Sequence, residues 1–411
     1  MALSFTDRFD GLPAYPFPRL RALLDGVTPA MGADDVIDLS LGEPQHAFPP
    51  FITEVIARTA SGFNRYPPMA GSDELLDAIK NWLDVRYDLP ANALDKNAHL
   101  LALSGTREGL FNVALANVPA TKGNERAAIL IPNPFYQCYA GAAASAGAEA
   151  VYLAANAETG FLPAFDKCDE KLLQRTAAIY LCSPGNPQGA VASADYLEKL
   201  IRLARKYEFL VILDECYAEI YDSMPPPGGL KAALRVSQKD GTLNDDPFSH
   251  VVVFHSLSKR SNLPGLRSGF CAGDKQVITR FKTLRDYGGA STALPVQAAA
   301  AAAWRDEAHV RENRAAYKRK FDIAENTLKG KLHFYRPPGG FFLWLNVGDG
   351  ETGALKLWKE GGVKVLPGRY LGRDESLGVQ GNPGKSYIRV ALVRDEAQTG
   401  EALSRMARIL G

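Results

Sequence analysis

The chain has 411 residues, enough for one large hydrophobic core and a smaller one beside it. Its 47 basic and 46 acidic side chains nearly cancel, so bulk charge gives no indication of a nucleic-acid or membrane-surface partner, and we expect neither. Hydrophobic residues make up 46 % of the chain, as in ordinary globular proteins, and the longest apolar stretch, residues 293–304, is far shorter than the roughly 20 residues that cross a bilayer.

The five cysteines show no C-x-x-C spacing, and the N-terminus has no pattern of a charged segment followed by an apolar one. An odd number of unpaired thiols without a secretion signal is typical of a cytoplasmic protein with reduced cysteines. We expect no metal site.

The N-terminal segment of the chain is rich in proline, with Pro13, Pro16 and Pro18. They predict an extended N-terminal arm over residues 1–35, which cannot bury itself and is therefore expected to lie on a partner subunit. Seven short apolar runs follow, separated in several places by helical patterns such as residues 107–116 and 195–207; the runs are residues 99–103, 127–131, 148–153, 177–182, 209–213, 251–254 and 270–272. Apolar runs alternating with helices predict an α/β fold with a mostly parallel sheet covered on both faces.

The composition changes after about residue 305. A charged helix is predicted over 307–328, strands over 341–346 and 387–391, and a last helix from Asp395. These patterns predict a smaller α+β domain made of residues 36–54 and 305–411 beside a large domain of residues 55–304. The alanine-rich segment 298–303 is predicted to join the two.

Polar side chains follow four of the predicted strands, beginning at Ser104, Asn186, Asp214 and Ser256. Ligands of open α/β sheets bind at the carboxyl ends of strands. The sequence therefore predicts one site built from distant parts of the chain.

Lys259 is the candidate centre of this site, because a lysine buried beside an apolar strand has a lowered pKa and can act as a nucleophile. Alone it would more often be a surface lysine. Its neighbours Ser256, Ser258 and Arg267 offer hydroxyls and a forked cation that suit a phosphate. The turn Ser104-Gly-Thr-Arg107 before a helix is a second, weaker anion signal.

Each remaining candidate has an ordinary structural alternative. Arg267 could form a surface ion pair, Asp214 could cap the next segment, and Asn186 could be a turn residue. Tyr217 could be a core tyrosine, and Arg389, within the apolar strand 387–391, could form an internal salt bridge instead of binding a ligand carboxylate.

In order and spacing these motifs resemble those of the fold-type I enzymes that use pyridoxal-5′-phosphate (PLP), specifically the class I/II aminotransferases, from Leu39-Ser-Leu-Gly42-Glu-Pro to Arg389. The resemblance implies a seven-stranded sheet, a PLP cofactor bound covalently by Lys259, and a homodimer with shared active sites. It implies that the cofactor is held by Gly105, Thr106, Arg107, Tyr136, Asn186, Asp214, Tyr217, Ser256, Ser258 and Arg267, with Tyr66 reaching the neighbouring subunit's phosphate. It also implies that Gly42 and Arg389, with Asn186, bind the substrate α-carboxylate.

The C-terminal segments 337–345, 365–373 and 382–393 most resemble the bacterial N-succinyl-LL-2,6-diaminopimelate aminotransferases of lysine biosynthesis, which use glutamate and 2-oxoglutarate. Both partners carry a distal carboxylate, for which Arg107 is the first candidate, with Arg19, Arg21 and Arg369 as alternatives. Residues 291–293 hold no arginine where aspartate aminotransferases carry one, which disfavours strict aspartate specificity. Aspartate, aromatic and acetylornithine aminotransferases, a PLP β-lyase and a PLP-sensing regulator domain remain as other readings.

Overall fold

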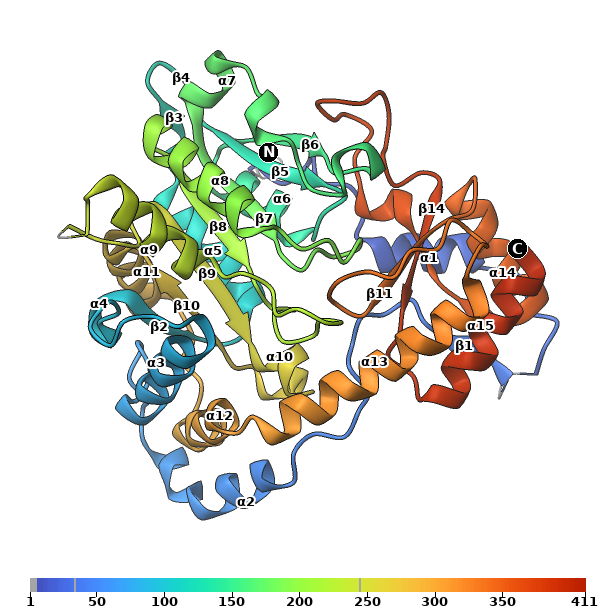
Figure 1. Cartoon of the computed structure of the whole chain (residues 1–411), viewed down its shortest axis with the longest axis horizontal. Coiled ribbons are helices and arrows are strands. Elements are labelled where there is room, and N and C mark those ends of the chain that lie inside the picture. The colour runs from blue at the N-terminus through green and yellow to red at the C-terminus, as the bar shows by residue number, and fades with distance from the viewer. Residues whose placement is uncertain (1–5, 33–34, 244) are drawn as a thin grey trace, which may run out of the picture.

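The computed structural model describes residues 6–32, 35–243 and 245–411 and divides them into two lobes (Figure 1). The larger lobe is built on a seven-stranded sheet with the order β2-β10-β9-β8-β7-β5-β6. Only β10 runs antiparallel to its neighbours. These strands are β2 (Leu100–Leu103), β5 (Ala128–Asn133), β6 (Glu149–Ala154), β7 (Thr176–Cys182), β8 (Leu210–Asp214), β9 (Val251–Ser256) and β10 (Gly269–Gly273). Each overlaps one of the seven predicted runs, so the predicted sheet is confirmed.

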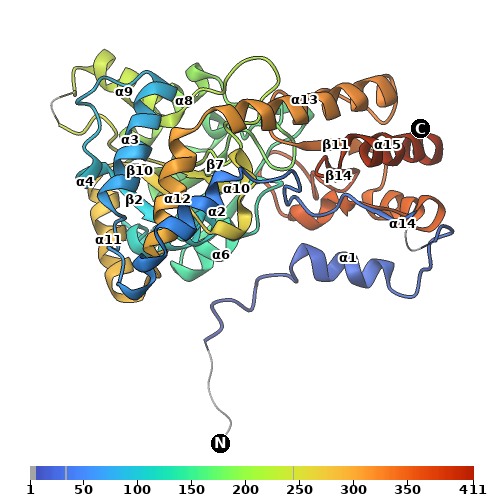
Figure 2. The same ribbon diagram turned by 90° about the horizontal axis from the view of Figure 1, so that it is seen from below.

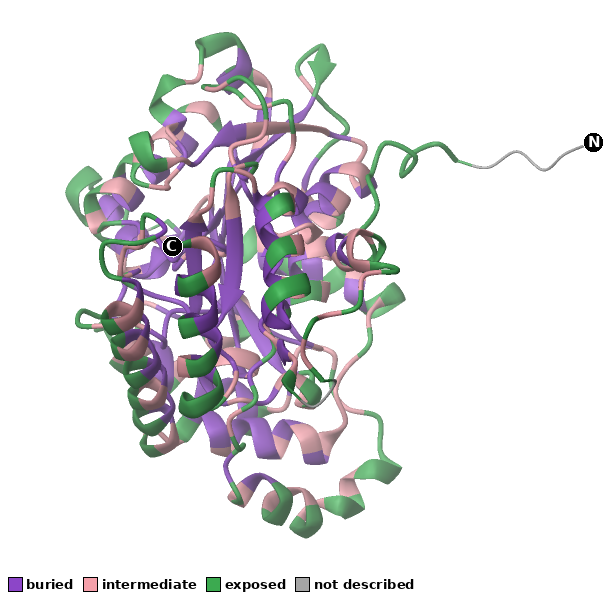
Figure 3. Cartoon of the chain, turned by 90° about the vertical axis from the view of Figure 1, so that its right-hand side faces the viewer, coloured by how far each residue is buried: buried purple, intermediate pink, exposed green. Residues whose placement is uncertain are grey.

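The strands are apolar throughout because helices cover both faces of the sheet, as the buried central strands of Figure 3 show. Val211 and Leu213 belong to the core on one face, and Leu210 and Ile212 to the core on the other. The first face is packed by α3 (Asp73–Tyr87), α8 (Ala194–Tyr207), α9 (Gly229–Asp240) and α12 (Leu294–Arg305), and the second by α5 (Thr106–Asn117), α6 (Cys138–Ser145) and α11 (Lys275–Gly288).

The smaller lobe holds an antiparallel sheet of the order β11-β14-β13, covered by α13, α14 and α15. These elements are β11 (Phe342–Asn346), β13 (Leu366–Pro367), β14 (Tyr387–Ala391), α13 (Ala308–Leu328), α14 (Gly350–Gly361) and α15 (Glu396–Leu410). Strand β1 (Ile37–Asp38) pairs with β12 (Val363–Lys364), which brings an N-terminal segment into this lobe. The remaining short elements are α2 (Phe51–Arg58), α4 (Lys96–His99), α7 (Glu170–Arg175), α10 (Leu257–Arg260) and the hairpin β3 (Thr121–Lys122) and β4 (Glu125–Arg126).

We had predicted an extended N-terminal arm, but the described part of the arm contains helix α1 (Pro16–Leu24) (Figure 2). Its two prolines lie in the first turn, where backbone N–H groups have no partner within the helix, so they begin the helix rather than prevent it. Leu20 is buried with Leu366 and Tyr370 of the smaller lobe. Residues 1–5 and 33–34 of the predicted arm lie outside the described residues.

The predicted linking role of the alanine-rich segment was wrong. Helix α12 packs against α2 and α3 within the larger lobe, and the small side chains of Ala299, Ala300 and Ala303 allow this close packing. The long helix α13 runs instead from the larger lobe to the smaller one (Figure 1). Among the described helices, none is both long and apolar enough to span a membrane.

Candidate active site

A cavity of about 520 Å³ lies between the two lobes, where strands β7, β8 and β9 end. Residues at the ends of these strands or just after them, including Asn186, Asp214 and Lys259, line one side. Phe342 and Arg389 from the smaller lobe line the other. The fold thus gathers the predicted strand-end residues into one site, because parallel strands present their carboxyl ends at the same edge.

Lys259 lies on the short helix α10, directly after β9, and it forms part of the cavity wall. Its Nζ donates a 2.6 Å hydrogen bond to the carbonyl oxygen of Gly42 and lies 5.5 Å from the centre of the Phe341 ring. Burial lowers the pKa of Lys259 to about 8. About a tenth of this amine is therefore neutral, and nucleophilic, at pH 7, far more than of an ordinary lysine.

The predicted anion-binding groups surround one end of the cavity. Gly105 has φ +90°, and a Cβ at this position would lie 2.1 Å from Nη2 of Arg267, so only glycine fits beside the guanidinium. Arg267 donates to the carbonyls of Pro264 and Ser104 and has no ion-pair partner among the described residues. The hydroxyls of Ser256 and Ser258 are 2.9 Å apart, and Ser256 also caps α10.

These groups meet at the N-terminus of α5, which begins at Thr106 and supplies free backbone N–H groups. Hydroxyls, a helix N-terminus and a guanidinium without a carboxylate partner are the donors that a phosphate requires. The surface ion pair considered for Arg267 is not observed among the described residues.

Asp214 is a buried carboxylate on the floor of the cavity. One oxygen accepts a 2.8 Å bond from the hydroxyl of Tyr139, and the other accepts from the backbone N–H of Cys216 at 3.2 Å. Burial raises its pKa, and no lysine or arginine pairs with it among the described residues. A cationic ring nitrogen at this place would supply the missing positive charge.

Tyr139, the hydrogen-bond donor to Asp214, was not predicted from the sequence. It lies in the first turn of α6, and nothing in its own segment marks it as a partner of Asp214, 75 residues away.

Arg389, in β14, is a buried cation without a carboxylate partner in the described part of the chain. Nη1 donates to Oδ1 of Asn186 at 3.1 Å, Nη2 donates to the carbonyl of Ser40 at 2.8 Å, and Nε has no partner. Burial lowers its pKa to about 10. The internal salt bridge considered above is therefore not observed, and the free N–H groups fit the carboxylate of a ligand.

Tyr217 and Phe342 complete this wall, with their rings packed edge to face at 5.8 Å. Gly42 lies so close to Phe342 that a Cβ would come within 2.6 Å of its ring.

Arg107 and Tyr136 line the opposite wall, where Arg107 Nε donates to the Tyr136 hydroxyl. The cavity is also lined by four residues that no pattern in the sequence predicted, Tyr15, Phe17, Leu41 and Glu43.

Five candidate residues do not line it, of which Gly105 directly precedes the lining residue Thr106. Tyr66 is fully exposed, which leaves its predicted contact with a neighbouring subunit untested. Arg19 lies 4.0 Å from the centre of the Tyr370 ring, Arg369 lies close to Glu351 and Asp374, and Arg21 makes no contact with the cavity.

The sequence model of the family Aminotransferase class I and II matches residues 34–406. The chain belongs to this family. The aminotransferase is therefore a PLP-dependent enzyme that moves an amino group between an amino acid and a 2-oxo acid.

Three relatives illustrate its closer similarities. The LL-diaminopimelate aminotransferase of Nitratidesulfovibrio vulgaris is 30 % identical over 427 aligned residues, covering 99 % of this chain and 100 % of the relative. The crystal structure of an aminotransferase from Neisseria meningitidis has a TM-score of 0.90 and 37 % identity, covering 99 % of this chain and 100 % of that one.

The crystal structure of aminotransferase AspB from Helicobacter pylori has a TM-score of 0.86 and 35 % identity, covering 97 % of this chain and 99 % of that one. None of these three carries the name of the N-succinyl enzyme, so the narrower prediction from the C-terminal segments gains no support from them.

Proposed function

We propose that Lys259 binds PLP covalently in this aminotransferase. The observation that carries the proposal is the pair of Asp214 and Arg389, a buried carboxylate and a buried guanidinium that line the cavity with Lys259 and lack ion-pair partners among the described residues. A cofactor with a cationic ring nitrogen would neutralise Asp214, and a substrate α-carboxylate would neutralise Arg389.

The other contacts follow from the groups around the cavity. We assign the phosphate to the amides of Gly105, Thr106 and Arg107 and to the side chains of Ser256, Ser258 and Arg267. Asn186 and Tyr217 would bind the ring hydroxyl oxygen, and Tyr136 would stack on the ring. Tyr66, which is exposed and does not line its own cavity, would reach the phosphate of a second subunit in a homodimer.

The bound cofactor supplies a conjugated ring that stabilises negative charge at the substrate Cα. The chain's own residues do the rest. Arg389, with Gly42, orients the α-carboxylate. The amine of Lys259, whose pKa of about 8 lets it both accept and donate a proton near neutrality, would take up and return the proton of the substrate Cα when the cofactor is bound.

For the substrate, we propose glutamate as donor and an N-succinylated 2-amino-6-oxopimelate as acceptor. Arg107 would bind the distal carboxylate. Among the described arginines that line the cavity, it is the one whose side chain neither the phosphate nor the α-carboxylate requires. The resemblance of the C-terminal segments supports the succinylated substrate.

A second candidate substrate is free LL-diaminopimelate, as the names of several relatives suggest. Glu43 lines the cavity and could accept the distal ammonium of this substrate, which the succinylated one lacks.

The test is the absorbance of the purified protein between about 300 and 500 nm, before and after addition of L-glutamate. We expect a visible band that glutamate shifts to shorter wavelength and that Lys259→Ala abolishes. Failure of the protein to bind added PLP would contradict the central proposal.

Substrate assignment then rests on kcat/KM for the succinylated and free diaminopimelates and for aspartate. Succinylated diaminopimelate should be the best substrate, and Glu43→Gln should impair only the free one if that candidate is right. Release of pyruvate and ammonia without a 2-oxo acid acceptor would indicate β-elimination instead.

A further inference from the structure

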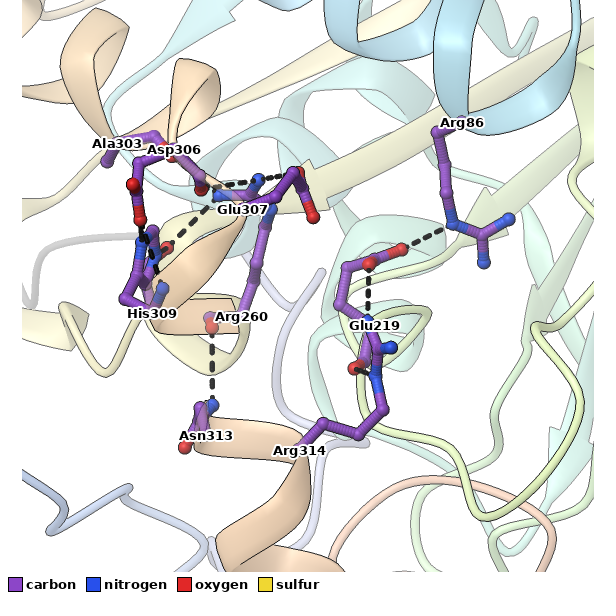
Figure 4. Close-up of polar contacts among 10 residues, drawn as sticks. Arg86, Glu219, Arg260, Ala303, Asp306, Glu307, His309, Asn313 and Arg314 are labelled. Carbon is purple, nitrogen blue, oxygen red and sulfur yellow. Dashed lines mark hydrogen bonds and ion pairs between the residues drawn. The ribbon is translucent and has the colours of Figure 1, made fainter. Parts of the chain in front are cut away.

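The backbone of Lys259 is held from outside the cavity by a buried asparagine of helix α13. Nδ2 of Asn313 donates to the carbonyl oxygens of Lys259, at 3.1 Å, and of Arg260, at 3.2 Å. Figure 4 shows Asn313 directed at the strand-end helix that carries these residues. Its Oδ1 accepts from Nδ2 of Asn262 at 3.0 Å and lies 2.8 Å from Nδ1 of His46. Every hydrogen-bonding position of the Asn313 amide is thus used.

His46 is in turn contacted by a buried lysine. Nζ of Lys320 lies 2.7 Å from Nε2 of His46 and 3.1 Å from the carbonyl oxygen of Leu392, and Lys320 is only 1 % exposed. An ammonium group can only donate, so Nε2 must accept and the ring proton must be on Nδ1. The hydrogen bonds therefore run in one direction, from Lys320 to His46, from His46 to Asn313, and from Asn313 to the backbone of Lys259.

The same chain of contacts also reaches the other partner of the Lys259 amine. His46 lies four residues after Gly42, whose carbonyl accepts the bond from Lys259 Nζ. Asn313 therefore ties both the backbone of Lys259 and the segment that receives its side chain to one helix. A fully satisfied buried network fixes geometry more firmly than separate contacts do.

We propose that Asn313 is a positioning residue for Lys259, with His46 and Lys320 fixing the direction of its hydrogen bonds. This inference goes beyond the aminotransferase reaction itself but rests on the proposed role of Lys259. Asn313 fixes the backbone of Lys259, and Gly42 receives its amine. Together these contacts keep the amine in the cavity wall, where it points at the cofactor site and burial lowers its pKa.

The network has a defined response to acid. Burial lowers the pKa of His46, which keeps Nε2 available as an acceptor. Protonation of His46 would place two donors, Nε2 and the Lys320 ammonium, against each other. The charged groups that face this pair are Arg319 on α13 and Asp395 and Glu396 at the start of α15. The network should therefore loosen on the acidic side of the lowered His46 pKa.

The test uses the cofactor-free protein and two readouts that do not depend on turnover. One is the pH dependence of Lys259 labelling by trinitrobenzenesulfonate, quantified on the Lys259 peptide. The other is the rate at which Lys259 captures added PLP. The variants are Asn313→Ala, His46→Ala and His46→Asn, the last of which keeps a donor in the place of Nδ1.

The control is Arg314→Ala, because Arg314 attaches the same helix to Glu219 without contacting Lys259 (Figure 4). We expect Asn313→Ala to slow PLP capture roughly ten- to hundred-fold, as small misplacements of reacting groups do. We expect it to raise the labelling pKa of Lys259 by about one unit, toward that of a solvated lysine. His46→Ala should act in the same direction, and His46→Asn should recover most of the loss.

Equal labelling and capture in Asn313→Ala and Arg314→Ala would overturn the positioning role. If Asn313→Ala does not fold, equal behaviour of His46→Ala and His46→Asn would overturn it instead. A wild-type protein that labels normally but never captures PLP would refute the proposed function, and the labelling data would still decide the role of Asn313.

Discussion

Arg389→Gln is the substitution whose effect follows most directly from the structure. Two of the five guanidinium N–H groups of Arg389 are occupied by Asn186 and Ser40, which leaves three, of which two can bind a substrate carboxylate. Two hydrogen bonds to a charged acceptor, at about 1.5 kcal/mol each, contribute about 3 kcal/mol. Their loss should lower kcat/KM for glutamate about 150-fold, since about 1.4 kcal/mol corresponds to a tenfold change.

The assay is steady-state kcat/KM for glutamate, with the visible absorbance of the bound cofactor as a check that PLP still binds. Arg389→Lys is the matched control. It keeps the charge but loses the fork, so a loss of about tenfold is expected. An Arg389→Gln enzyme with cofactor bound and kcat/KM within about fivefold of wild type would show that Arg389 does not hold the α-carboxylate.

Three further outcomes are expected. Gly105→Ala should weaken PLP binding at least about tenfold, because its Cβ would displace Arg267. Gly123→Ala is the control, since Gly123 also has a positive φ but open space around it, and it should not weaken binding. Equal effects of the two substitutions in a PLP titration would contradict the phosphate site. Tyr139→Phe removes a hydrogen bond that lowers the pKa of Asp214, so the pKa of Asp214 should rise further. The acidic limb of the kcat/KM profile should then move to higher pH, and an unchanged limb would show that it does not report the titration of Asp214. The rate of PLP capture by the cofactor-free protein should rise with pH through about 8 and then level off, because the neutral amine of Lys259 is the nucleophile and its pKa is lowered. A stopped-flow rate that still rises at pH 10 would show that Lys259 has the pKa of an ordinary lysine.

Several features of this protein could be predicted from the sequence because they are local. The strands could be recognised because apolar runs such as residues 251–254 must be buried on both faces, and a parallel sheet provides that burial. The site could be placed because polar residues directly follow these strands, and parallel strands end at one edge. Lys259 stood out through its immediate neighbours Ser256 and Ser258.

Other features depended on which segments meet in space. Helix α1 was missed because a proline-rich segment can either extend or begin a helix, and contact with the smaller lobe favours the helix here. Tyr139 was missed because nothing in its own segment shows that it reaches Asp214, 75 residues away.

The contact between His46 and Lys320 joins residues 274 positions apart in the sequence. Local pattern fixes which side chains are apolar or polar and where the strands end. Only the packing of the two lobes decides which buried polar group has all its hydrogen bonds satisfied, as Asn313 has. It also decides which buried charges at the cavity, those of Asp214 and Arg389, lack an ion-pair partner among the described residues and can take one from a ligand.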